Sequence, residues 1–192
     1  STHITALKFQ TDSSIPFYLS YRTYNKGKGW LPYVSSKDSG EYAGFGTADT
    51  RYVQAVGIKV LDSATGVSLD KNYIVMYRVF TNDKWLPWVS NATPELMYAV
   101  FDEFNLGGSL DTSSGNAGLA GTDHVLTRFQ IRIFKDNNLS EDTDSFTGGE
   151  INTGMSYLVD SEWKSFTDRV TASHIDGLKI QTSTNRDYYL LY

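Results

Sequence analysis

Two nearly identical heptapeptides carry aromatic side chains that could bind a ligand. They are WLPYVSS at residues 30–36 and WLPWVSN at residues 85–91. Each follows a short polar segment typical of a turn, so its rings are expected close to a loop. Indole and phenol rings near loops offer flat apolar faces with a polar edge, and the C–H faces of sugar rings can stack on them. The two segments therefore predict a carbohydrate-binding site.

The rings of the two heptapeptides are expected to play different roles. Trp30 and Trp85 recur at the same place in each segment, which favours the core because large aromatic side chains dominate burial in small domains. Three residues later the ring changes type, to Tyr33 and Trp88, so we expect this position to face a groove and hold the ligand. Trp30 and Trp85 remain candidate ligand contacts beside them.

Polar and aromatic neighbours could complete the site by hydrogen bonding to sugar hydroxyl groups. The candidates for this role are Arg22, Tyr24, Asn25, Lys28, Arg78, Asn82, Asp83 and Lys84.

Catalytic and metal sites are poorly supported by the sequence. Asp102-Glu103 and the acidic stretch 141–144 could supply the paired carboxylates of a glycosidase, but acidic pairs in loops are usually only solvated. His3, His124 and His174 form no metal-binding or nucleophile motif. Oxygen-bearing side chains at 136–144 could hold calcium, yet their spacing differs from a calcium loop, which favours an acidic turn. We expect no catalytic residue, metal ion or cofactor.

Composition narrows the class of protein and partner. Aromatic residues make up 14% of the 192 residues, more than core packing needs. The formal charge of −5, without a basic run, argues against nucleic acid as the partner. No apolar run reaches the roughly 18 residues of a membrane helix, so membrane insertion is not expected. The absence of cysteine excludes disulfides and suits both the cytosol and export from Gram-positive bacteria.

Short alternating runs predict strands, each with one buried and one solvated face. They are clearest at 56–60, 73–79 and 129–133. The exception is 94–101, where a proline follows Thr93 and predicts a helix with Thr93 as its N-cap.

One strand motif occurs four times in the sequence, which predicts an internally repeated fold. It reads ITALKFQT from residue 4, VQAVGIKV from 53, LTRFQIRI from 126 and IDGLKIQT from 175. An aromatic block lies in each interval, at 17–34, 73–89 and, in degenerate form with Trp163 and Phe166, at 155–168. We predict a single all-β domain over 1–192, with units of about 4–62, 63–135 and 136–192 in a pseudo-threefold, β-prism-like arrangement. A β-trefoil and a two-sheet sandwich are the alternatives.

The repeated blocks resemble the clostridial hydrophobic repeat. LSYRTYNKGKGWLPYVSS with AGFGTADTRYVQAVGIKV is similar to that repeat in its tyrosine, its Gly-Trp pair and its closing apolar strand. VMYRVFTNDKWLPWVSN with AGLAGTDHVLTRFQIRI looks like a second copy, in which Lys84-Trp85 stands where Gly29-Trp30 stands in the first. SYLVDSEWKSFTD with IDGLKIQ is a remnant. Related modules target lytic enzymes to Gram-positive walls, so the resemblance implies binding to a wall polymer without turnover.

The resulting expectation is a secreted or wall-associated, non-catalytic module that targets a peptidoglycan hydrolase, endolysin or bacteriolysin to the bacterial surface. A catalytic domain elsewhere in the full-length protein is left open. One alternative is an adhesin, phage tail or lectin-like protein that binds host glycans. The second is a glycosidase or peptidase domain that uses Asp102, Glu103 or His124.

Overall fold

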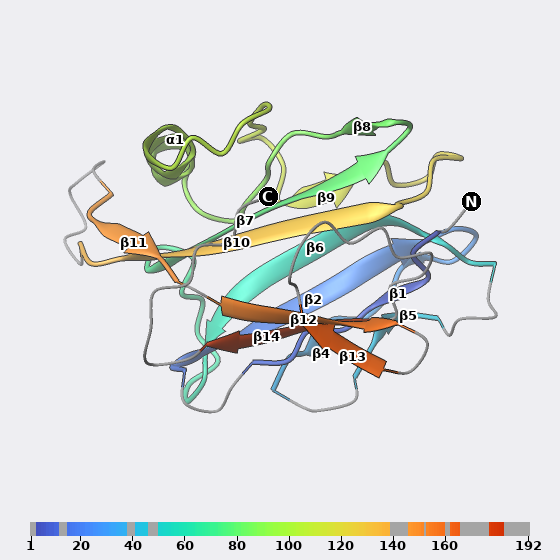
Figure 1. Cartoon of the computed structure of the whole chain (residues 1–192), viewed down its shortest axis with the longest axis horizontal. Helices are drawn as coiled ribbons and strands as arrows, with labels where there is room; N and C mark the ends of the chain where they lie inside the picture. The colour runs from blue at the N-terminus through green and yellow to red at the C-terminus, as the bar shows by residue number, and fades with distance from the viewer. Residues whose placement is uncertain are drawn as a thin grey trace.

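The computed structural model of this chain is built almost entirely from β-strands (Figure 1). It describes residues 3–11, 15–37, 41–45, 50–138 and 146–151, together with the backbone of three strands between 153 and 182. The elements are β1 (Ala6–Leu7), β2 (Phe17–Asn25), β3 (Gly29–Trp30), β4 (Val34–Ser35), β5 (Ala43–Gly44), β6 (Val53–Asp62), β7 (Tyr73–Thr81), β8 (Lys84–Trp85), α1 (Pro94–Glu103), β9 (Asn116–Gly118), β10 (Arg128–Asp136), β11 (Gly148–Glu150), β12 (Thr153–Val159), β13 (Glu162–Ser165) and β14 (Gly177–Thr182). The predicted all-β class is confirmed.

Three sheets share one local pattern, in which a central strand pairs with a short tryptophan-bearing strand on one side and a long returning strand on the other. The central strands are β2, β7 and β12, and all of these pairings are antiparallel. The registers match as well: Tyr24 lies opposite Trp30 and Ala55, Phe80 opposite Trp85 and Arg128, and Leu158 opposite Trp163 and Gly177. The sequence repetition therefore has a counterpart in the hydrogen bonding of the strands.

The main core lies between the inward faces of the first two sheets. β2 contributes Phe17, Leu19 and Tyr21, and the facing strand β7 contributes Val75 and Tyr77. Residues alternate along β2 between buried and partly exposed because successive side chains of a strand point to opposite faces. The alternation fixes which side chains of β2 are left for the outer face.

Helix α1 covers the outer face of the second sheet, as Figure 1 shows above β7 and β10. It begins after Thr93, whose side chain accepts a hydrogen bond from the amide of Leu96, so the predicted N-cap is confirmed. Met97 and Val100 of the helix pack against Ile74 and Met76 of β7. The expectation of one solvated face on this strand is therefore wrong over its first half, because the helix buries it.

Two tyrosines at matching positions, Tyr21 and Tyr77, place their hydroxyl groups in the core. Tyr21 accepts the amide hydrogen of Phe9 at 2.9 Å, and Tyr77 accepts that of Ile58 at 3.0 Å. Tyr77 also donates to the carbonyl of Gly115. Burial raises the pKa of both phenols. Each tyrosine thus ties its own sheet to a neighbouring segment by hydrogen bonds that water cannot compete for.

No helix in the described part of the chain has the length and apolar character that a membrane span requires.

Candidate functional site

The outer face of the first sheet gathers aromatic and cationic side chains from three strands. On β2 the inward positions, from Phe17 to Asn25, are buried, so the alternating positions Arg22 and Tyr24 point outward. The turn at 26–28 reverses the chain and sets Trp30 opposite Tyr24 in β3. The chain then rejoins β2 at β4, directly after Tyr33. The hairpin thereby brings four residues that are spread over twelve positions of sequence onto one surface.

These side chains form a row of stacked rings and cations, here called the aromatic–cation row. The rings of Tyr24 and Trp30 meet edge to face with centroids 5.5 Å apart. The Arg22 guanidinium carbon lies 4.4 Å from the Trp30 centroid and 4.6 Å from that of Tyr33, so it is held between two rings. Lys59 of β6 continues the row, with its Nζ 4.7 Å from the Tyr33 centroid. Cation–π contacts of this kind hold the row in place.

The second sheet carries the same arginine–aromatic stack, but here part of the protein covers the last ring. Arg78 lies between Trp85 and Trp88, with its guanidinium carbon 4.8 and 4.4 Å from the two centroids. Trp88 is fully buried beneath α1 and the segment after it, and its indole nitrogen donates to the carbonyl of Gly107 at 2.9 Å. Burial lowers the pKa of Arg78. Trp88 therefore belongs to the core between α1 and the second sheet and offers no face to a ligand, whereas Trp85 stays partly exposed.

The structure corrects the expected roles of the tryptophans. The groove position predicted for Trp88 is wrong because the 92–121 insertion folds over it. The core positions predicted for Trp30 and Trp85 are also wrong, since both are only partly buried and stack on arginines on the outer faces. Tyr33, with 36% of its surface exposed, remains accessible. Trp163 lies in β13, but its side chain is outside the described residues, as is Phe166.

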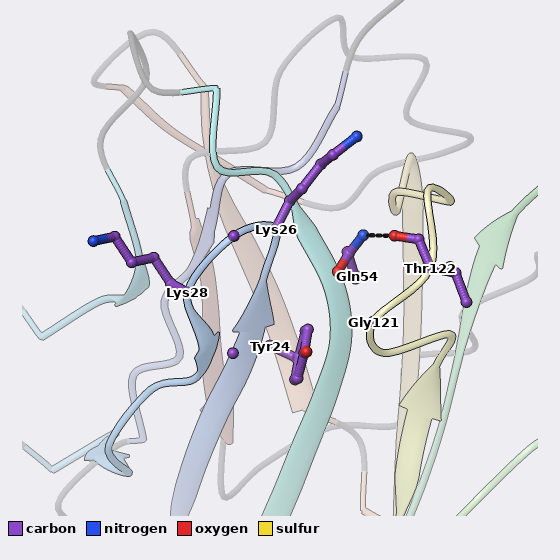
Figure 2. Close-up of a pocket in the computed structure, with 8 residues that line it drawn as sticks. Tyr24, Lys26, Lys28, Gln54, Gly121 and Thr122 are labelled. Atoms are coloured by element: carbon purple, nitrogen blue, oxygen red, sulfur yellow. Dashed lines mark hydrogen bonds between the residues drawn. The ribbon is translucent and has the colours of Figure 1, made fainter.

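An open pocket of about 400 Å³ adjoins the row at the β2–β3 turn (Figure 2). Tyr24 lines it together with the backbone of the turn glycines, and Lys26 and Lys28 extend from the turn on either side. Lys26 is paired with Asp123 at 3.0 Å, whereas Lys28 is exposed. Gln54 and Thr122 close the far wall through a hydrogen bond between them. The pocket thus continues the aromatic–cation row past Tyr24.

Three other predicted polar contacts have structural roles. Asn25 is fully buried, and its amide donates to the carbonyls of Thr5 at 3.2 Å and Arg51 at 2.7 Å, so its predicted ligand contact is wrong. Asn82 and Asp83 form the turn between β7 and β8 with φ of 49° and 57°. Asparagine and aspartate tolerate this left-handed backbone, which explains their presence in the turn. Lys84, which follows them, is exposed on the second sheet.

The candidate catalytic and metal-binding groups are not brought together. Asp102 and Glu103 are exposed at the end of α1, and His124 is exposed in a loop. Among the described residues no three His, Asp or Glu side chains are placed to hold a metal ion. Asp136 is buried and accepts the amides of Asn138 and Thr147, so it closes the base of its loop. Residues 139–145, with the rest of the calcium candidates, lie outside the described part, as does His174.

The sequence also contained a member of the row that we did not predict, Lys59. It lies one strand away from the heptapeptide, and only the pairing of β2 with β6 brings it to Tyr33. Its outward position could have been predicted from the alternation in VQAVGIKV, where Ile58 and Val60 are buried.

Comparisons of this chain with protein-family models, curated proteins and solved structures gave no match.

Proposed function

We propose that this chain is a non-catalytic module that binds a polymer of the bacterial cell wall through the aromatic–cation row of its first sheet. One observation carries the proposal. The same arginine–aromatic stack occurs twice: its last ring is fully buried in the copy that ends with Trp88, and in the other copy Tyr33 is exposed beside Arg22 and Lys59. An exposed ring next to hydrogen-bond donors is what sugar recognition requires, because the ring takes the apolar face and the donors take the hydroxyl groups.

Each contact in such a site is weak. A stacked ring contributes on the order of 1 kcal/mol, so one exposed ring does not give tight binding on its own. A wall polymer presents the same residue many times, and repetition raises the effective affinity without new contacts. The polymeric nature of the wall therefore fits the modest size of the row. The resemblance of the repeated blocks to the clostridial hydrophobic repeat is the basis for proposing a Gram-positive wall as the source of the polymer and a secreted or wall-associated location for the chain.

We also propose that the three sheets are arranged as a pseudo-threefold, β-prism-like body. The matched registers around Trp30, Trp85 and Trp163 support this arrangement. In such a body each sheet turns one face to a common core and one face outward. The aromatic–cation row would then be one of three related outer surfaces, of which the second is closed by α1.

Co-sedimentation with purified walls tests the proposed function. Walls from several Gram-positive species, before and after removal of teichoic acid, are mixed with the protein, and bound and free fractions are quantified. We expect sedimentation with at least one wall type and no release of labelled peptidoglycan fragments. Binding to host glycans but to none of the walls would instead favour the adhesin or lectin-like alternative. Release of labelled fragments would favour the enzyme.

A further inference from the structure

The two arginine–aromatic stacks differ in what satisfies their cations. In the register of the sheets, Arg22 lies opposite Gly57 and Arg78 lies opposite Gln130. Two residues farther along each returning strand stand Lys59 and Arg132, which are therefore also at matching positions. The first and second sheets thus each carry a pair of cations at the same two positions of the outer face.

In the second sheet, protein groups satisfy both cations. Arg78 Nε donates to the Gln130 side chain at 2.8 Å, and another of its nitrogens donates to the carbonyl of Gly107 at 3.2 Å. Arg132 makes a two-pronged ion pair with Glu150, with nitrogen–oxygen distances of 2.7 and 2.6 Å. Each of these two cations therefore already has acceptors within the protein.

In the first sheet the matching acceptors are missing. Arg22 has no side-chain acceptor opposite it because that residue is Gly57, and its Nε is covered without a hydrogen-bond partner among the described residues. A Cβ at Gly57 would lie 2.6 Å from Asn116 Oδ1, so a larger residue there would displace the exposed Asn116 side chain. Lys59 is exposed, and within the described part of the chain its ammonium has no ion pair. The nearby carboxylate of Asp70 already accepts from the Val60 amide and the Ser68 hydroxyl.

The environment of Arg22 suits an anion. Its two faces are covered by Trp30 and Tyr33, so the guanidinium is held in a fixed orientation and only its edge is left to donate. A donor fixed before binding loses little entropy when a ligand arrives. The chain as a whole has a formal charge of −5, so its overall field does not attract anions. Recognition of an anion must therefore come from a local arrangement such as this one.

We infer that Arg22 and Lys59, beside Tyr33, form a binding site for an anionic group, a carboxylate or a phosphate, carried by the polymer. This inference depends on the proposed function, because it names the chemical class of the polymer that the same surface binds. Arg22 supplies directional hydrogen bonds from its edge, Lys59 supplies a second positive charge, and Tyr33 supplies a ring for the adjoining sugar or polyol.

Titrations with three polymers test the inference and separate the two sources of charge. The probes are polygalacturonate, which carries carboxylates, a poly(glycerol phosphate) teichoic acid, which carries phosphates, and dextran, which is neutral. Affinity is measured by isothermal titration calorimetry for the wild type, Lys59→Gln and Arg22→Gln. Lys135→Gln is the matched control because Lys135 is an exposed lysine on a strand of the second sheet. Circular dichroism checks that each variant is folded. Because Lys59 is exposed, Lys59→Gln should fold normally, so its effect on affinity can be measured even if Arg22→Gln unfolds.

We expect one charged polymer to bind and dextran to bind far more weakly. Each of Lys59→Gln and Arg22→Gln should weaken that binding by roughly tenfold, the lower end for a hydrogen bond to a charged group. Lys135→Gln should leave it unchanged, and salt should weaken the wild-type interaction by screening. Equal binding of dextran and of the variants would overturn the anionic site while leaving the proposed wall binding intact. Failure of all three polymers and of purified walls to bind would overturn both.

Discussion

Truncation of Trp88 and of Tyr33, which occupy the same place in two copies of one motif, should destabilise the protein to very different extents. Trp88 is fully buried between α1 and the second sheet, and its indole nitrogen donates to the carbonyl of Gly107. Removing a buried tryptophan costs about 3–5 kcal/mol, and this hydrogen bond adds about 1 kcal/mol. Tyr33 is exposed over 36% of its surface and has no comparable cavity to leave. We expect Tyr33→Ala to cost about 1 kcal/mol or less.

Urea unfolding followed by far-ultraviolet circular dichroism measures both costs. Fluorescence is unsuitable because one variant removes a tryptophan. The expected loss for Trp88→Ala, about 4–6 kcal/mol, corresponds to a fall in Tm of roughly 8–24 °C for a domain of this size. Trp30→Ala, which removes a half-buried ring from the outer face, should fall between the two. Equal losses for Trp88→Ala and Tyr33→Ala would refute the assignment of one copy to the core and the other to the surface.

Other changes test the core and the row. Tyr77→Phe should destabilise the protein by about 1–3 kcal/mol in urea unfolding, because the buried amide of Ile58 loses its acceptor. Burial raises the pKa of Tyr21 and Tyr77 above the usual value near 10, so their neutral phenols give full stability below pH 10, and Tm should fall as the pH rises above it; a flat Tm up to pH 11 would contradict this. Gly57→Ala should lower the free energy of unfolding by about 1 kcal/mol or less, because only the exposed side chain of Asn116 has to move aside, and a second change, Asn116→Ala, should remove that cost.

Much of the fold could be predicted from local pattern. The alternating runs at 56–60, 73–79 and 129–133 lie within β6, β7 and β10, and Thr93 caps α1 as expected. These features depend on neighbouring residues along the chain: period-two alternation for strands, and a side-chain acceptor with a following proline for the helix start. The repeated sequence likewise predicted a repeated strand arrangement, which the matched registers display.

The burial of particular rings could not be predicted in this way. Trp88 and Tyr33 share their local sequence, and what separates them is the insertion 92–121, whose helix folds back over one of them. Lys59 was missed for a related reason, because its contact with Tyr33 depends on the pairing of strands far apart in sequence. Asn25 looked like a surface turn residue, but the chain at Thr5 and Arg51 closes over it. Each of these outcomes is decided by tertiary contacts.

Equilibrium binding to purified Gram-positive walls, compared between wild type, Tyr33→Ala and Tyr98→Ala, tests the role of the first sheet most directly. Tyr98 is the matched control because it is an exposed tyrosine, 54% accessible, on α1 of the second sheet. Loss of one stacked ring, worth about 1 kcal/mol, should weaken binding by Tyr33→Ala about fivefold per site, and more on a multivalent wall. Tyr98→Ala should bind like the wild type. Undiminished binding by folded Tyr33→Ala, or an equal loss in both variants, would contradict recognition through the aromatic–cation row.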